Sequence, residues 1–351
     1  MQMHLIIAML FVIAVAMAFI EDYIEDFYKL LVLSAFGLFM ILLATTKSVE
    51  HTADAPGYED MFLNNDDALI EIATEPTYIY LSRLILLFGG SVAVIFFIYA
   101  IIAIPAKLKA IYTLTPYVFT ALLIYIPVYF ELHDMVQIRA AAAAAFLLSS
   151  LVPLSKKCYW QATLLMIGGT LFHYSAIVYL PFLLLGNRRL SLVWRFVVAG
   201  LVPASFVMYL MKKDLLSLVP SSLLGGKVDY YKASAEAGGW TDISLPYKNL
   251  YFMTKCVILY LCLYYYDLIV KQNPFAPILI NLFAASIVFL LVMATIPVLA
   301  GRISDMYGIV DCVVFTYLLY LVSPSFIARI AIATVGFYMI VYNMLTTEYF
   351  T

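Results

Sequence analysis

The chain has 351 residues, of which 65% are hydrophobic and only 12% are charged, and its formal net charge is −2. Soluble domains carry about 25% charged residues, so this composition excludes an ordinary soluble protein. The slight acidic balance also argues against nucleic acid as a partner, because nucleic-acid binding calls for a basic patch. A mean hydropathy of +0.99 indicates a protein built from membrane-spanning segments.

Apolar segments recur along the whole sequence, and most are long enough to cross a hydrocarbon core of ~30 Å as helices. Membrane β-barrels are excluded, because their strands alternate apolar and polar residues over about ten positions. The pattern predicts an all-α polytopic membrane protein, a single integral domain over 1–351 with ten or eleven transmembrane helices. The predicted spans are 3–20, 29–46, 79–103, 111–130, 135–152, 159–185, 191–211, 249–270, 275–298, 306–322 and 326–346.

The positions of lysine and arginine predict which side of the membrane each connection faces. The basic clusters at 156–157 and 188–195 should share the cytoplasmic side, although the apolar run 159–185 separates them. Two interpretations stay open: a re-entrant hairpin at 159–185, which is permitted where protein or water surrounds the backbone, or one tilted crossing that violates the charge rule. With the hairpin, the long polar connections 47–78 and 212–248 both face outward, away from the cytoplasmic side.

Polar side chains at or inside the apolar spans are the strongest functional signal, because such residues cost at least a few kcal/mol in lipid. Arg139 opens the helix IRAAAAAAFLL, whose alanines would let a neighbouring helix approach closely. Arg302 lies in GRISD and His173 in LFHYS. Each has a structural alternative, namely a snorkelling arginine paired with Asp134, an interface anchor and a satisfied core histidine. Together the three predict one polar site inside the bundle.

The first outer connection supplies further candidates. Asp54, Tyr58 and Phe62 recur at four-residue spacing and would share one face of a helix. Glu75 and Arg83 bracket the entry to the next span. For each of these residues, a solvated loop with a capped helix start is the structural alternative.

The sequence predicts neither a metal site nor a cofactor. The acidic run at 59–67 lacks the ordered spacing of a calcium loop, and the four cysteines lack the spacing of metal ligands. No phosphate-binding loop, dinucleotide fingerprint, zinc-protease motif or serine-hydrolase elbow occurs. These absences argue against nucleotide-driven and common metal-dependent transfer chemistry.

In their order and spacing, these motifs resemble the EpsG/Wzy-type polysaccharide polymerases of bacterial envelopes. The resemblance covers most of the chain: Asp-x-x-x-Tyr-x-x-x-Phe at 54–62, Glu-Pro-x-Tyr and an arginine at 75–83, Arg139 before its alanine-rich helix, Phe-His-Tyr-Ser-Ala at 172–176, and Gly-Arg-Ile-Ser…Tyr at 301–307. It implies a GT-C-like, multi-pass protein of the bacterial inner (cytoplasmic) membrane with its active site facing the periplasm. The connection 212–248 matches no pattern of the family.

The resemblance also implies a reaction, partners and residue roles. A growing glycan leaves its undecaprenyl diphosphate carrier and passes to a sugar hydroxyl of the next lipid-linked unit, and a chain-length regulator protein is a further partner to test. Arg139 and Arg302 would neutralise the departing diphosphate. His173 would accept the hydroxyl proton, with Asp54 or Glu75 as the alternative base. The residues predicted to bind substrate are Asp54, Tyr58, Glu75 and Arg83.

Other functions stay open at this stage. An O-antigen ligase, or another polyprenyl-linked glycosyltransferase, would use the same kind of site with a different acceptor. A transporter of lipid-linked glycan or of a small anion would use the arginines as a path, but the sequence shows no second copy of the GTLFHYSA break that paired transporter halves would share. A membrane acyltransferase built around His173 would leave Arg139 and Arg302 without a role.

Overall fold

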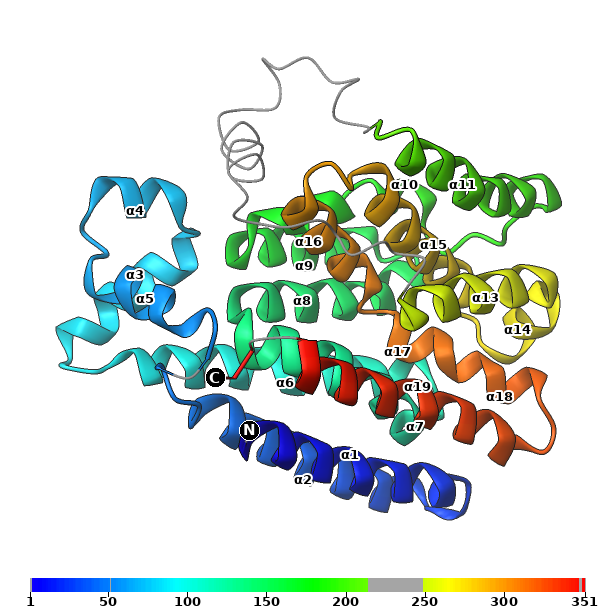
Figure 1. The fold of residues 1–351 in the computed structure, drawn as a ribbon, viewed down its shortest axis with the longest axis horizontal. Helices are drawn as coiled ribbons and strands as arrows, with labels where there is room; N and C mark the ends of the chain where they lie inside the picture. The colour runs from blue at the N-terminus through cyan, green and yellow to red at the C-terminus, as the bar shows by residue number, and fades with distance from the viewer. Residues whose placement is uncertain (1, 51, 214–248, 347–348, 351) are drawn as a thin grey trace. The chain divides into compact units, whose positions relative to one another are not determined.

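The computed structural model describes residues 2–50, 52–213, 249–346 and 349–350, and these residues are almost entirely helical (Figure 1). Among them, β-structure is limited to an isolated bridge between Thr52 and Phe350. The structure therefore confirms the predicted all-α fold. Most of the predicted outer connection 212–248 lies outside the described residues.

Within the described chain, seven helices are long and apolar enough to cross a membrane, or eight if one sharply bent pair counts as a span. The protein is thus polytopic, as predicted. The number is below ten because several predicted spans form shorter or broken helices. The span 159–185 is interrupted at His173, between α9 (Tyr159–Phe172) and the 3-10 helix η3 (Tyr174–Tyr179). The break lies where the sequence predicts one, and the re-entrant path itself stays a prediction.

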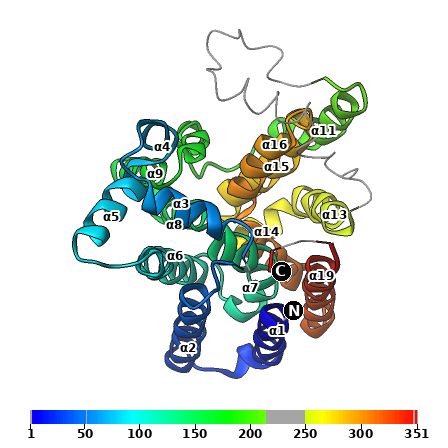
Figure 2. The ribbon, with the colours of Figure 1, turned by 60° about the vertical axis from the view of Figure 1, so that its left-hand side comes forward.

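The described residues form two compact units, residues 1–186 with 315–351 and residues 187–314. In the first unit, helices pack in succession, each against the next: α2 (Asp26–Thr45), α6 (Val92–Leu114), α8 (Ile138–Ser155) and α9. A second group of packed helices consists of α1 (Gln2–Ile20), α7 (Val118–Ile124) and α19 (Ser325–Thr346) (Figure 2). Between α2 and α6 the chain forms the short helices α3 (Ala55–Leu63), α4 (Ala68–Ala73) and α5 (Pro76–Leu87).

α8 lies between α6 and α9 and can pack closely against both, because its first turns are rich in alanine. Every side chain of 140–145 is buried, and 142–145 are completely inaccessible. Small residues let helix backbones approach one another in a membrane. α8 accordingly packs against α6 on one side and α9 on the other. This confirms the packing surface predicted from the sequence.

An ion pair lies in the interior of the first unit. α7 continues into a π-helix, η2 (Tyr125–Val136), which carries Asp134. Lys107 Nζ donates to both carboxylate oxygens of Asp134 at 2.8 Å, and the Tyr125 hydroxyl donates to the same group at 2.8 Å. Asp134 is therefore the partner of Lys107 and not of Arg139.

The second unit also encloses a buried charge pair. It contains α11 (Leu192–Leu210), α13 (Leu250–Tyr264), α14 (Tyr266–Gln272), α15 (Ala276–Val292), α16 (Pro297–Gly308) and α17 (Asp311–Val314). α13 and α14 meet at 86°. Lys255 Nζ lies 2.8 Å from Asp311, whose carboxylate also accepts a hydrogen bond from the Tyr251 hydroxyl at 2.8 Å. Isolated charges are too costly to bury without a partner, so this pair fixes how α13 and α17 meet.

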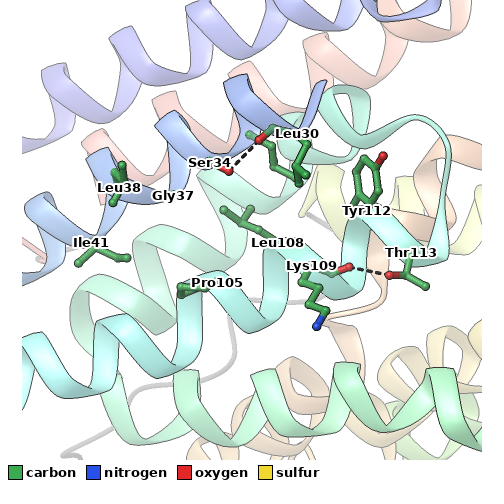
Figure 3. Close-up of a pocket in the computed structure, with 11 residues that line it drawn as sticks. Leu30, Ser34, Gly37, Leu38, Ile41, Pro105, Leu108, Lys109, Tyr112 and Thr113 are labelled. Atoms are coloured by element: carbon green, nitrogen blue, oxygen red, sulfur yellow. Dashed lines mark hydrogen bonds between the residues drawn. The ribbon is translucent and has the colours of Figure 1, made fainter. Parts of the chain in front are cut away.

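A groove of about 690 Å³ lies between α2 and α6 (Figure 3). Most of its lining is apolar, and Leu38 and Leu108 are typical of it. The hydroxyls of Ser34 and Thr113 are occupied by carbonyls four residues earlier in their own helices, each at 2.8 Å. The groove presents mainly hydrocarbon, which suits a lipid chain better than a polar substrate.

The packing of α19 on α7 yields a stability prediction. A Cβ at Gly336 would collide with the Leu123 carbonyl oxygen and would lie 2.7 Å from the Phe11 ring. Gly336→Ala should therefore cost about 1–3 kcal/mol, the usual penalty for overpacking, and lower the melting temperature in detergent. The control is Gly200→Ala in α11, where the added Cβ meets nothing within 4 Å. Equal melting temperatures for the two variants would contradict the close approach of α19 and α7.

Candidate functional site

The starts of α5 and α8 and the end of α9 meet at one point in the first unit. Each contributes a polar side chain there. Glu75 is the N-cap residue of α5, Arg139 is the second residue of α8, and His173 occupies the break after α9. These helices, with α3, gather on one side of the unit (Figure 2). Glu75 is extended (φ −67°, ψ 143°) because it precedes Pro76, whose fixed φ suits the first helical position.

The Glu75 carboxylate joins the other two side chains. Its Oε1 lies 2.7 Å from His173 Nδ1 and accepts the Tyr174 backbone N–H at 3.3 Å. Its Oε2 accepts a short hydrogen bond from Arg139 Nη1. Glu75 is only 3% exposed, so it forms these contacts in a water-poor environment, where they are stronger than in water.

The pKa of Glu75 shows that the carboxylate stays ionised. Burial alone would raise this pKa, but the hydrogen bond from His173 and the positive charge of Arg139 outweigh burial and lower it from 4.5 to about 2. An ionised carboxylate can only accept hydrogen bonds, so His173 Nδ1 carries the proton. The other ring nitrogen, Nε2, is then the acceptor of a neutral imidazole.

Aromatic rings surround the guanidinium of Arg139. Its Cζ lies 5.5 Å from the centre of the Tyr58 ring and 5.9 Å from the centre of the Tyr78 ring, within the range of cation–π attraction. The Tyr78 hydroxyl donates to the Tyr58 carbonyl at 2.6 Å, which ties α5 to α3. Arg139 Nε is buried and has no hydrogen-bond partner among the described residues. The guanidinium thus retains a donor that its neighbours do not use.

The structure therefore brings together four of the predicted site residues, namely Tyr58, Glu75, Arg139 and His173. Tyr78, a member of the Glu-Pro-x-Tyr motif, completes the aromatic contacts although the sequence assigns it no role. We refer to these five residues as the Glu75 cluster.

The remaining predicted residues lie outside the Glu75 cluster. Asp54 is an exposed residue at the start of α3. Arg83 belongs to a surface ion-pair group, because it lies 3.1 Å from Glu71 and 3.4 Å from Asp66. Arg302 is a half-buried residue of α16 in the second unit.

Sequence reasoning missed Lys47, which lies two residues after the end of α2 and is 5% exposed. Its Nζ donates to the Met135 carbonyl at 2.6 Å and lies 4.3 Å from the centre of the Phe96 ring. A lysine at the end of an apolar span is typical of an interface anchor, so the sequence carries no signal for this contact.

Among the described residues, no group of three or more His, Cys, Asp or Glu side chains is placed to hold a metal ion.

The family model described as "EpsG family" matches residues 29–350. No curated protein and no solved structure matches the chain. The matched range contains every residue of the Glu75 cluster.

The electrostatics of the cluster predict a pH-dependent loss of stability in Glu75→Gln. Each pKa unit is worth about 1.4 kcal/mol, so the variant should lose roughly 3 kcal/mol of unfolding free energy at pH 7. Because the folded pKa is depressed, this stabilisation is fully present above pH 4.5, the unfolded value, and is lost as the pH falls towards 2. Denaturant unfolding in detergent from pH 7 to pH 2 measures it, and the difference between the two proteins should shrink steadily towards the acidic end.

The matched control is Glu71→Gln. The Glu71 side chain is 48% exposed and pairs with Arg83 at the surface, where such pairs contribute less than about 1 kcal/mol. A comparable loss in both variants would contradict the central role of the Glu75 carboxylate.

Proposed function

The chain belongs to the EpsG family of Wzy-type polysaccharide polymerases, and from that premise we propose that it polymerises polyprenyl-diphosphate-linked oligosaccharide units at the periplasmic face of the bacterial inner membrane. The donor is a growing glycan on undecaprenyl diphosphate, and the acceptor is a hydroxyl of the next lipid-linked unit. The product is an O-antigen or exopolysaccharide chain, and a chain-length regulator protein is a further proposed partner.

The observation that carries this proposal is the contact between Glu75 and His173 Nδ1 at 2.7 Å. It leaves Nε2 of the imidazole as the proton acceptor. In the proposed step, Nε2 takes the proton of the acceptor hydroxyl while the hydroxyl oxygen forms a bond to the anomeric carbon of the donor sugar. Glu75 holds the ring and stabilises the imidazolium that results, so Glu75 orients the base instead of acting as the base itself.

Arg139 is suited to the leaving group. As the bond between the anomeric carbon and the diphosphate oxygen breaks, the electron pair remains on the departing undecaprenyl diphosphate. The Arg139 side chain is 19% exposed, and Glu75 and two tyrosine rings hold its guanidinium in place, so the guanidinium can stabilise that charge without reorganising. We propose Arg302 as a second cation for the diphosphate.

We assign the other predicted residues lesser roles. Tyr58 positions Arg139, and Asp54, at the exposed start of α3, binds sugar hydroxyls. Arg83 organises the outer connection through Glu71 and Asp66, so we expect it to affect substrate binding only weakly.

The experiment that tests this function is a gel of surface polysaccharide from the source strain with the gene deleted, complemented by wild type or variants. Deletion should collapse the ladder to a single repeat. An unchanged ladder would overturn the proposal. Intact polymer left on its lipid carrier would indicate a ligase, and single repeats trapped on the cytoplasmic side would indicate a transporter.

Two variants should reproduce the deletion. Arg139→Lys removes the fork-shaped pair of donors and should slow polymerisation by about 10²–10³-fold, the usual effect of losing one preorganised donor. His173→Ala removes the base and should cost about 10²–10⁴-fold. Arg83→Lys is the matched control and should leave the ladder nearly intact. Full-length polymer from Arg139→Lys or His173→Ala, at normal protein levels, would contradict these roles.

A further inference from the structure

Two helices end just before residues of the Glu75 cluster. α9 ends at Phe172, next to His173, and η2 ends at Val136, shortly before Arg139. The last carbonyls of a helix have no partner within it and must be satisfied from elsewhere. In both helices a side chain from the chain segment 47–77 bonds to a carbonyl of the last turn. We propose that these side chains, Thr77 and Lys47, are positioning residues that hold the base and the cation of the site in register.

Thr77 acts at the end of α9. Its hydroxyl donates to the Leu171 carbonyl at 2.7 Å, two residues before His173. Thr77 itself lies two residues after Glu75, in the first turn of α5. The turn that supplies the carboxylate therefore also fixes the helix end that supplies the imidazole. Glu75 and His173 are thus joined twice, once directly and once through the backbone beside each of them.

Lys47 acts at the end of η2. Its ammonium donates to the Met135 carbonyl at 2.6 Å, where the partial negative charge of a helix end favours a cation. Gln137 links η2 to α8 and is followed two residues later by Arg139. The contact fixes the point from which α8 starts, and with it the direction in which Arg139 enters the cluster.

The surroundings of Lys47 support a functional reason for burying it. Its amine faces the carboxylates of Asp134, from η2, and Asp54, before α3; Asp134 is already bonded to Lys107 from α6. Burial lowers the pKa of Lys47 to about 7, although both carboxylates raise it. Because this folded value lies below the ordinary 10.5, the charged amine costs the folded protein stability. The contact should be strongest below pH 7 and weaken as the pH rises.

The inference rests on the proposed function, and its test uses purified full-length protein with lipid-linked repeat units extracted from the deletion strain. Thr77→Val, which keeps the shape of threonine but lacks the hydroxyl, should lower kcat by about 10- to 100-fold with KM little changed, since displacements near 1 Å have effects of this size. Thr77→Ser should restore kcat. A Thr77→Val enzyme with wild-type kcat and only a lower melting temperature would overturn the role of Thr77.

The Lys47 contact has its own signature in the pH profile. Lys47→Arg keeps its charge above pH 7, so its activity should persist to higher pH than that of wild type. Lys47→Met should lose about 10-fold in kcat at pH 6.5, whereas Lys109→Met, an exposed lysine of α6, should not. If the activity of Lys47→Arg falls at the same alkaline pH as that of wild type, the role of Lys47 is overturned.

If wild type itself makes no polymer from these units, the proposed function fails. If wild type is active, only the positioning roles are at stake.

Discussion

The contact on which the rest of the site depends is the bond between one buried carboxylate and two side chains that are 64 and 98 residues away along the chain. A guanidinium at the edge of an apolar bundle is costly unless an anion compensates it, and the Glu75 anion is equally costly without the guanidinium. Each residue therefore makes the burial of the other tolerable. The imidazole of His173 forms a hydrogen bond with the other oxygen of the same carboxylate. The starts of α5 and α8 and the break after α9 consequently meet at one point.

Three further contacts between ionisable side chains in the first unit show what such pairing achieves for the fold. Lys107 meets Asp134, His4 lies 2.7 Å from Glu131, and the guanidinium of Arg329 approaches Glu21. Hydrocarbon surfaces can slide past one another at little cost, because lipid contacts are as apolar as helix contacts. Paired charges cannot slide without being separated. These pairs therefore set the register of α1, α6, η2 and α19, and leave the Glu75 cluster on a scaffold with fixed positions.

Much of this arrangement could be predicted from the sequence, and what could not has a physical explanation. A polar residue inside an apolar run is visible in one dimension, so Arg139 and His173 could be singled out, as could the alanine packing surface and the break at His173. The partner of a charge is not visible in this way. Asp134 lies near Arg139 in sequence but pairs with Lys107, and Arg83 pairs with Glu71 and Asp66 at the surface. Thr77 and Lys47 bond to backbone carbonyls, and any residue supplies a carbonyl, so no motif marks them.

The charge content of the Glu75 cluster has a consequence for the timing of turnover. With a neutral imidazole, the cluster contains one cation and one anion and is neutral overall, which suits the approach of an uncharged sugar hydroxyl. If the imidazole takes up the proton as proposed, the same cluster would carry a net positive charge when the proposed anionic carrier is released beside it. The spent carrier would then be attracted most strongly at the end of the cycle. Its departure and the loss of that proton to the surrounding water become linked events, so the acidity of the compartment that the cluster faces would set how quickly the next round begins.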